Sequence, residues 1–550
     1  MTSQLHCALL LLTASLAAQT TSPPTAPGSF RIAGVVVDSV SKAPVANARV
    51  TVLASENSDV SQRATAGPDG RFVFSGLTAG KYTLLASAPG YRSQGFHQHE
   101  NYFVGISVGP DLDSEHIVFP LVLDARIEGA VTDEDGEPIR NANVQLYQRN
   151  HDTGKLLTRL VRGTNTDDRG HYLFSHLGPG TYYIAVSARP WYAQYQQTNG
   201  PVPEAKVAER IAEERTQLDV AYPLTFHPSA EDSSGATAIT LHPGDRVTAD
   251  VSMRAEPAVH LRVKSAETEG ATPGSMTVHG FPRISQRVFE GILVPVLAFQ
   301  GMGATGGVVE YTGIATGHYV LAMPGSGGKH GNGWYKEMDL SGTVELDASE
   351  NPPLASVSGT LRVEGANRPP GHIYVVLSNR TSAETFAAEV TPKGTFDFSD
   401  MEVRPGTYDV VLNVAQGYQL TAIAASGARV NGQSLVVSGG SVQLALTASG
   451  ALARINGTVQ EGDSPHPGAM VVLVPRDPVS NFMLFRRDES DSDGTFSLRD
   501  VLPGSYTVIA LRDGWEVDWA NPATLQPYLK NGVPVEISGQ TKLSVKVPLQ

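Results

Sequence analysis

The stretch Asp493–Val508, DGTFSLRDVLPGSYTV, contains the pattern on which the rest of the chain is built. It combines an Asp-Gly step, apolar residues at alternate positions (Phe496 and Leu498), a Pro-Gly step and a tyrosine, Tyr506. Glycine accepts the positive φ angles of tight turns, and alternating apolar residues place one face of a strand on a core. The stretch therefore predicts a turn, a short strand, a second turn and a second strand.

The same skeleton occurs four more times upstream. In each copy a Gly-x-aromatic triplet precedes a Gly-x-Tyr triplet, and in one eroded copy valine replaces the aromatic residue. We expect each tyrosine to bury its ring while its hydroxyl bonds a backbone group, as in the tyrosine corner of immunoglobulin-type sandwiches. The copies are Gly70–Phe72 with Gly80–Tyr82, Gly170–Tyr172 with Gly180–Tyr182, Gly307–Val309 with Gly317–Tyr319, and Gly394–Phe396 with Gly406–Tyr408.

A second shared element precedes the clear copies. In the first unit it is Arg31–Asp38 (RIAGVVVD) followed by Pro44–Leu53 (PVANARVTVL), and in the second Ile127–Asp133 (IEGAVTD) followed by Pro138–Tyr147 (PIRNANVQLY). The composite pattern resembles the carboxypeptidase regulatory-like domain, a family of small prealbumin-like or starch-binding-like β-sandwiches. The resemblance is close in the first, second and fifth units. It implies non-catalytic modules of a kind found in exported bacterial repeat proteins.

We therefore predict an all-β fold: a tandem array of about five small antiparallel β-sandwich domains, immunoglobulin-like or prealbumin-like. One short helix is expected in the second domain, at residues 203–215, where alanines and an isoleucine form a narrow apolar stripe after a proline. The predicted division is a signal peptide at 1–18, a linker at 19–29, and sandwiches at 30–124, 125–256, 257–349 (degenerate), 350–449 and 450–550.

Composition and charge limit the cellular locations and the classes of binding partner that the protein can have. The chain has 550 residues, only 17% of them charged, with 55 glycines and 36 prolines, which is typical of a turn-rich β protein. Residues 1–18 contain an apolar run and end in small residues, so we expect a secretory signal and a periplasmic, extracellular or cell-surface location. The single cysteine, Cys7, lies in that run, and no later stretch has the length of a membrane helix. A net charge of -14 argues against nucleic acid as a partner.

No motif predicts catalysis, a cofactor or a metal site. The nucleophile elbow, the zinc-protease motif, the phosphate loop and the dinucleotide fingerprint are all missing from the sequence. His97, His99 and Glu100 form the densest group of metal-binding residue types, but a third ligand at suitable spacing is not evident, and a solvated loop explains them better. Asp-Gly turns explain the acidic fragments Asp133–Gly136 and Asp491–Gly494 better than calcium loops do.

Aromatic residues in the loops are the candidate ligand-binding residues, because exposed rings stack on sugar faces. The candidates are Trp191, Tyr192 and Tyr195 in the second domain, Trp334 and Tyr335 in the third, and Trp515 and Trp519 in the fifth. The leading hypothesis is a non-catalytic protein that binds carbohydrate at the cell envelope. The alternatives are a structural spacer or protein-adhesion stalk with an envelope protein as partner, and an accessory part of a hydrolase or peptidase system.

Overall fold

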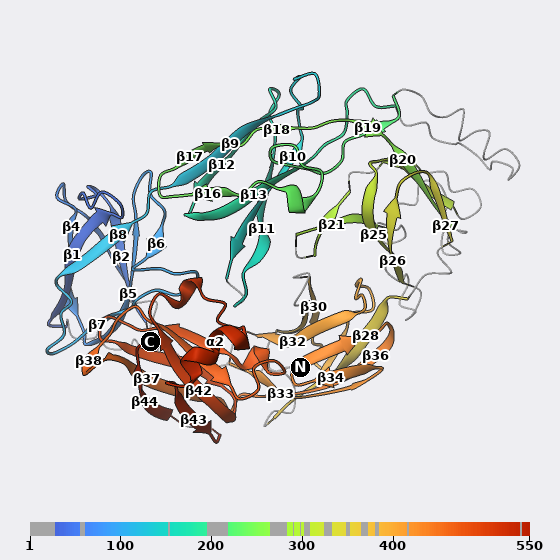
Figure 1. The fold of residues 1–550 in the computed structure, drawn as a ribbon. Coiled ribbons are helices and arrows are strands. Elements are labelled where there is room, and N and C mark those ends of the chain that lie inside the picture. The colour runs from blue at the N-terminus through green and yellow to red at the C-terminus, as the bar shows by residue number, and fades with distance from the viewer. Residues whose placement is uncertain are drawn as a thin grey trace, which may run out of the picture.

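A computed structural model describes residues 28–55, 61–151, 154–194, 218–264, 283–289, 291–296, 299–301, 308–323, 333–347, 353–364, 372–379, 384–414, 417–539 and 542–550. The predicted all-β tandem array is confirmed, and Figure 1 shows its successive groups of strands. The predicted signal peptide and the predicted helix at 203–215 lie outside the described residues.

The first two modules comprise β1 to β18. The first contains β1 (Phe30–Asp38), β2 (Arg49–Ala54), β3 (Ser61–Thr65), β4 (Arg71–Leu77), β5 (Gly80–Ser87), β6 (Gln94–Gly95), β7 (Ile106–Val108) and β8 (Ile117–Leu121). The second contains β9 (Ala125–Thr132), β10 (Asn143–Asn150), β11 (Leu157–Asn165), β12 (His171–Leu177), β13 (Gly180–Ser187), β14 (Val220–Ala221), β15 (Thr225–Phe226), the 3-10 helix η2 (Ser233–Gly235), β16 (Ile239–Leu241), β17 (Arg246–Thr248) and β18 (Val251–Ser252).

The third and fourth modules comprise β20 to β36, after β19 (Glu256–Pro257), which pairs with β14. The third contains β20 (Val259–Lys264), β21 (Arg283–Val288), β22 (Ile292–Pro295), β23 (Phe299–Gly301), β24 (Val308–Ile314), β25 (Gly317–Met323), β26 (Trp334–Leu340) and β27 (Val344–Asp347). The fourth contains β28 (Ala355–Val363), β29 (Ile373–Asn379), β30 (Thr385–Glu389), β31 (Thr395–Asp397), β32 (Gly406–Val414), β33 (Gln419–Ser426), β34 (Ala428–Asn431), β35 (Ser434–Val437) and β36 (Gly440–Ser449).

The fifth module carries a short helix that the sequence did not predict, α2 (Pro522–Leu529), which begins after an Asn521 cap. Its other elements are β37 (Ala453–Glu461), β38 (Ser464–Pro465), β39 (Met470–Pro475), η5 (Phe482–Leu484), β40 (Arg486–Glu489), β41 (Thr495–Val501), β42 (Gly504–Leu511), η6 (Gly514–Glu516), β43 (Val533–Ile537) and β44 (Lys542–Pro548). The boundary residues between the modules stay a prediction.

Each module is built from two sheets that enclose one apolar core. The eroded third copy follows the same plan, with sheets β23-β24-β20-β27 and β22-β21-β25-β26. Most strand pairs are antiparallel, as predicted. Each module adds parallel pairing, because its first strand pairs with one strand near its end, or with two in the second module. The pairs are β1 with β8, β9 with β17 and β18, β20 with β27, β28 with β36, and β37 with β44.

The aromatic residue of the Gly-x-aromatic triplet lies opposite a glycine of the first strand. In the fifth module Phe496 pairs with Gly457, where a Cβ atom would lie 2.4 Å from the Phe496 ring and 2.6 Å from the Val545 carbonyl oxygen of β44. A side chain at this position would therefore separate both neighbouring strands. The same pairing joins Gly34 with Phe72, Gly129 with Tyr172, and Gly359 with Phe396.

The predicted tyrosine corner is confirmed in all five modules. Each repeat tyrosine is buried, and its hydroxyl donates to the carbonyl oxygen four residues earlier. The bonds are Tyr82 to Thr78 (2.9 Å), Tyr182 to Gly178 (3.0 Å), Tyr319 to Ala315 (2.7 Å), Tyr408 to Arg404 (2.8 Å) and Tyr506 to Leu502 (2.9 Å).

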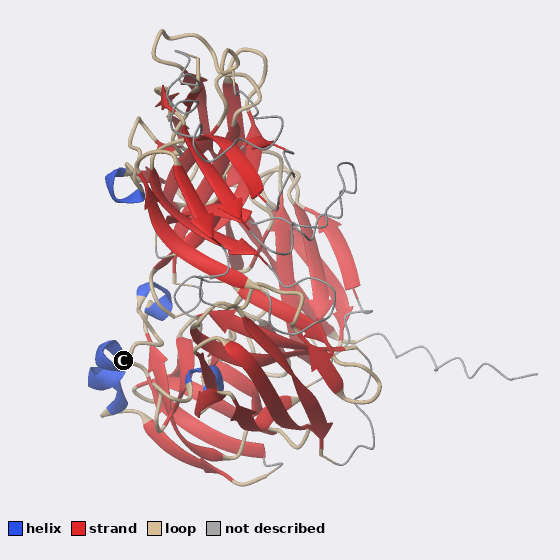
Figure 2. Cartoon of the chain, turned by 90° about the vertical axis from the view of Figure 1, so that its right-hand side faces the viewer, coloured by secondary structure: helices blue, strands red, loops and turns tan. Residues whose placement is uncertain are grey.

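The five modules curve round so that the first meets the fifth (Figure 1). Figure 2 shows that strands, with a few short helices, make up the array. The turn between β10 and β11 of the second module also reaches the fifth, near α2. There the Leu156 N–H donates to Asp518 (2.9 Å), and the Ala520 N–H donates to the Gly154 carbonyl (3.0 Å). The array therefore folds back on itself and is not an extended rod.

A buried charged group fastens the end of the second module to the third. His260 on β20 bonds Asp219 through Nε2 (2.7 Å) and faces Glu310 through Nδ1 (3.4 Å), and all three side chains are at most 9% exposed. Arg262 also donates to Glu310 (3.1 Å). Burial alone would lower the pKa of His260, but the two carboxylates outweigh it and raise that pKa to about 9.

Loss of the tyrosine hydroxyl should destabilise one module. Tyr408→Phe leaves the buried ring in place but leaves the Arg404 carbonyl without its hydroxyl donor, so we expect the fourth module to lose about 1 kcal/mol of unfolding free energy. Hydrogen exchange of β29 and β32, measured by mass spectrometry, would report this local change. Tyr374→Phe, at a position on β29 that is 37% exposed, is the matched control and should leave exchange unchanged. Equal effects of the two changes would contradict the assigned role of the hydroxyl.

The His260 group should stabilise the protein in a defined pH window. Its pKa is raised above the ordinary value of about 6.5, so its contribution is complete below that pH and is lost as the pH rises through about 9. We expect His260→Gln to lower the thermal midpoint most below pH 6.5, with a difference from the wild type that shrinks towards pH 10. Calorimetry between pH 5 and 10 measures this difference in thermal midpoint between the variant and the wild type. His318→Gln is the control for a surface histidine of the same module, whose imidazole is half exposed and bonds the exposed Asp339 (2.8 Å). A pH-independent His260→Gln effect would contradict the assignment.

Candidate binding site between the first and fifth modules

A wide hollow lies between the first and fifth modules. It has a volume of about 820 Å³. One wall is the turn Gly76–Tyr82 between β4 and β5. The other wall is the outward face of β37, β41 and β44, with Arg454, Asn456, Thr458, Ser497, Arg499 and Ser544.

A second hollow of about 450 Å³ shares lining residues with the first. Ser55, Lys81, Ser497 and Arg499 line both. Its remaining walls include the loop 101–105 of the first module and β40 of the fifth. The two hollows together are called the 1–5 groove below. Because both walls come from different modules, the groove exists only when the array is closed.

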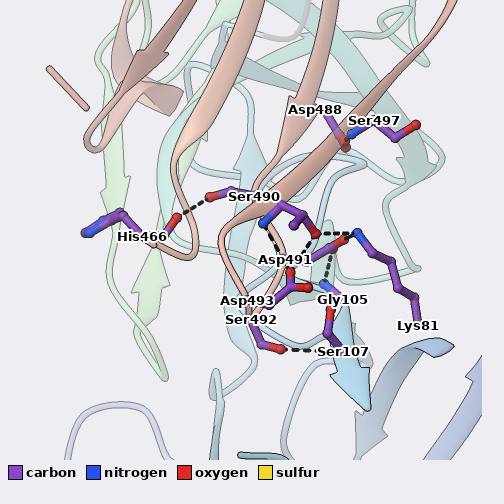
Figure 3. A network of polar contacts seen from close by, with 11 residues as sticks. Lys81, Gly105, Ser107, His466, Asp488, Ser490, Asp491, Ser492, Asp493 and Ser497 are labelled. Carbon is purple, nitrogen blue, oxygen red and sulfur yellow. Dashed lines mark hydrogen bonds and ion pairs between the residues drawn. The ribbon is translucent and has the colours of Figure 1, made fainter. Parts of the chain in front are cut away.

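A network of polar contacts fixes the two walls against each other (Figure 3). Lys81 bonds the Asp491 carboxylate and donates to the Thr495 hydroxyl (2.7 Å). Asp491 also accepts the Gly105 N–H (3.0 Å), and the Ser492 N–H returns a bond to the Gly105 carbonyl (2.9 Å). The Asp-Gly turn that was predicted as a turn and not as a calcium loop is thus also a docking element.

A cluster of aromatic rings surrounds Arg487 beside the smaller hollow, which Arg487 and Tyr102 line. The Arg487 guanidinium donates to Glu100 (2.7 Å) and lies over the rings of Tyr102 (4.9 Å) and Trp519 (4.1 Å). The His99 ring stacks on Trp515, with centroids 5.0 Å apart and planes 2° from parallel. Cation–π contacts and stacking of this kind stabilise an interface when the groups are shielded from water.

Burial perturbs the carboxyl groups of this interface. It raises the pKa of Asp488 to about 6, although the carboxylate accepts the Ser497 N–H (2.6 Å). Burial also raises the pKa of Asp491, against the opposing effect of Lys81. The pKa of Glu489 is likewise raised by burial, against its bond to His99 (3.0 Å). The charged forms of these acids therefore carry a cost in the closed array.

The aromatic candidates from the sequence fall into different surroundings. Trp191 is 87% exposed and lies edge-on to Tyr192, whose hydroxyl donates to Glu134 (3.0 Å). Trp334 is buried in the third module's core, with Tyr335 half-buried beside it. Tyr195 lies outside the described residues.

Trp515 and Trp519 are brought together, but not as exposed rings. They are 9% and 7% exposed and belong to an apolar cluster of the fifth module. The first module adds His99 and Tyr102 against Trp515, and Arg487 of the fifth module covers both indoles. Neither offers a free face for a sugar in the closed array. The first-module partners of Trp515 lie about four hundred positions away in the chain, so local sequence could not reveal their contact with this ring.

The groove residues themselves were missed by the motif search. Arg454, Asn456 and Thr458 alternate with buried residues on β37, and Ser497 and Arg499 do so on β41. This alternation marks a solvent-facing side of a sheet, and nothing local indicates that a second module covers it.

The described residues hold no group of three or more His, Cys, Asp or Glu side chains that could bind a metal ion. Nor do they contain a helix long and apolar enough to cross a membrane.

Two segments match the model of the carboxypeptidase regulatory-like domain: residues 31–101 and 126–254. The resemblance seen in the sequence is therefore confirmed for the first two modules. A search of curated proteins finds no match.

Among solved structures, the chain is similar to a minor pilin of Streptococcus agalactiae, with 14% identity, a TM-score of 0.22, and coverage of 42% of this chain and 97% of the pilin. It is also similar to a shaft pilin of Lactobacillus rhamnosus GG, with 9% identity, a TM-score of 0.18, and 42% and 98% coverage. The Bacillus anthracis TIE protein has 9% identity, a TM-score of 0.16, and 95% and 68% coverage. At these values the similarities say nothing about function.

Removal of the Asp488 charge should stabilise the closed array at high pH. A carboxyl group whose pKa is raised to about 6 in the folded state destabilises that state once it ionises, and the penalty disappears as the pH falls towards 4. We expect Asp488→Asn to raise the thermal midpoint at pH 8 and to leave it unchanged below pH 4. Calorimetry at both pH values tests this. Asp463→Asn removes an exposed charge from the same module and should change neither midpoint. A lower midpoint for Asp488→Asn at pH 8 would contradict the assignment.

Proposed function

We propose that this array of carboxypeptidase regulatory-like modules is an exported, non-catalytic protein of the bacterial cell envelope that binds carbohydrate in the 1–5 groove. The observation that carries the proposal is the groove itself, whose walls come from the first and fifth modules and carry amide, hydroxyl and guanidinium side chains.

The size and lining of the groove suit a polar chain molecule. Its larger hollow, at about 820 Å³, lies within the usual range for small-molecule sites, roughly 300–1,000 Å³. Asn456, Thr458 and Ser544 present amide and hydroxyl groups along the sheet face. Such groups hydrogen-bond sugar hydroxyls, and they serve as both donors and acceptors.

The exposed Trp191, with the half-buried Tyr192 beside it, supports a second point of contact on the same kind of ligand. The Trp191 ring is 87% exposed, so it has a face available for stacking on a sugar. It lies on the loop after β13 of the second module, at the end of β10 away from the β10–β11 turn, and it does not line the groove. We assign it an auxiliary role outside the groove.

The second candidate function is a spacer or protein-adhesion stalk. A spacer separates its two ends, whereas here the first and fifth modules are joined by hydrogen bonds, ion pairs and stacked rings. The closed arrangement therefore favours ligand binding over extension. A protein-adhesion role remains the alternative that the following experiment distinguishes.

Filling the groove should abolish retention of the protein on polysaccharide. Ser544→Trp places an indole on the exposed side of β44 inside the groove. We expect the wild-type protein to be retained by at least one polymer of a panel of cellulose, xylan, starch, chitin and pectin. Retention on that polymer should be lost in the variant, as measured by affinity electrophoresis.

The matched control is Ser252→Trp, at an exposed position of β18, the last strand of the second module. It should be retained like the wild type, and circular dichroism should show that both variants are folded. Loss of retention in Trp191→Ala but not in Ser544→Trp would move the site to the exposed ring. Failure of the wild type to bind any polymer would contradict carbohydrate binding and favour the protein-adhesion alternative.

A further inference from the structure

The carboxylates that line the 1–5 groove are already occupied by donors of the protein itself. Each accepts hydrogen bonds from a side chain or from the backbone, so none needs a cation or a ligand donor. The occupied groups are Asp491, bonded by Lys81 and the Gly105 N–H; Asp493, bonded by the Thr495 N–H (3.1 Å) and hydroxyl (2.6 Å); and Asp488, bonded by the Ser497 N–H (2.6 Å).

Two arginines of the same lining are not occupied in this way. Arg454 on β37 and Arg499 on β41 are both exposed and both line the larger hollow. Their strands are antiparallel neighbours, in which Ala453 pairs with Val501 and Ile455 with Leu498. The register shifts between these two pairs, so Arg454 on one strand lies opposite the short segment of the other strand that contains Arg499. Within the described ranges, neither guanidinium forms a hydrogen bond or an ion pair.

The unbalanced charge of the groove is therefore positive, in a chain whose net charge is -14. A guanidinium group binds a carboxylate through two parallel N–H···O bonds, which adds direction as well as attraction. The neighbouring Asn456, Thr458 and Ser544 suit neutral hydroxyls. A ligand that satisfies both sets has carboxylates spaced along a hydroxyl-rich chain.

We infer that the ligand of the 1–5 groove is an acidic carbohydrate of the uronic-acid class, with Arg454 and Arg499 binding its carboxylates. This inference rests on the proposed function and specifies the ligand of the same site. The net charge of -14 works against nucleic acids, whose phosphate charges are more densely spaced than the single carboxylate on each sugar of a uronic-acid chain. Within the groove, the carboxylates of a short uronic-acid segment would lie close to the guanidinium groups of Arg454 and Arg499.

The test compares two polymers with the same backbone. Polygalacturonate carries free carboxylates, and its methyl ester carries none. We expect the full-length protein to bind polygalacturonate about tenfold more tightly than the ester in calorimetric titration at low salt, because only the free acid forms the charged contacts. The double variant R454Q/R499Q should lose this preference and still bind the ester.

The matched control is R362Q/R429Q, which removes two exposed arginines of the fourth module and changes the net charge equally. It should keep the wild-type preference. Equal wild-type binding of the two polymers, or a preference that survives in R454Q/R499Q, would overturn the inference while leaving carbohydrate binding intact. So would tighter binding of dextran sulfate or single-stranded DNA than of polygalacturonate, since that outcome indicates general attraction to polyanions. No binding to any polysaccharide would overturn the proposed function instead.

Discussion

A hydrogen bond from a buried tyrosine hydroxyl to the carbonyl oxygen four residues earlier recurs in every module and secures the crossing between its two sheets. It fixes the turn by which the chain passes from one sheet of the sandwich to the other, as from β4 to β5. Without the hydroxyl, a polar carbonyl would be buried unpaired beneath a large ring, which is costly. In the first module this same turn, Gly76–Tyr82, forms one wall of the 1–5 groove, so the internal bond of a module also shapes the candidate site.

The interior of each module could be predicted from the sequence because its signals are local. Turn glycines, alternating apolar residues and the tyrosine act within about fifteen residues of one another, and they sufficed even for the eroded copy around Tyr319. The closure of the array could not be predicted. The contact of Lys81 with Asp491 depends on the angles at all four junctions, and no short pattern encodes them. The helix α2 was also missed, because Pro527 inside it hides its periodicity.

The difference between local sequence signals and contacts between distant modules also explains which candidate binding residues the sequence indicated. Trp515 and Trp519 look exposed in the sequence, but both pack in an apolar cluster of the fifth module, and the first module also covers Trp515 in the closed array. Arg454 and Arg499 look like ordinary surface residues of a strand, but they line a hollow because a second module faces them. Residue type alone favoured the rings. The hydrogen bonds within the groove favour Arg454 and Arg499 as ligand-binding residues instead, because the carboxylates of the lining are already bonded to donors of the protein.

The parallel pairing of each module's first strand with a strand near its end has a mechanical consequence. In the fourth module the pairing runs from Ala355 with Gly440 to Val363 with Ala448, and the chain enters at one end of this ladder and leaves at the other. Tension applied along the chain would load these strands in shear, so that many hydrogen bonds must break together and not one after another. Once the first and fifth modules separate, each module would resist stretching on its own, and the closed array would release length before any sandwich unravels.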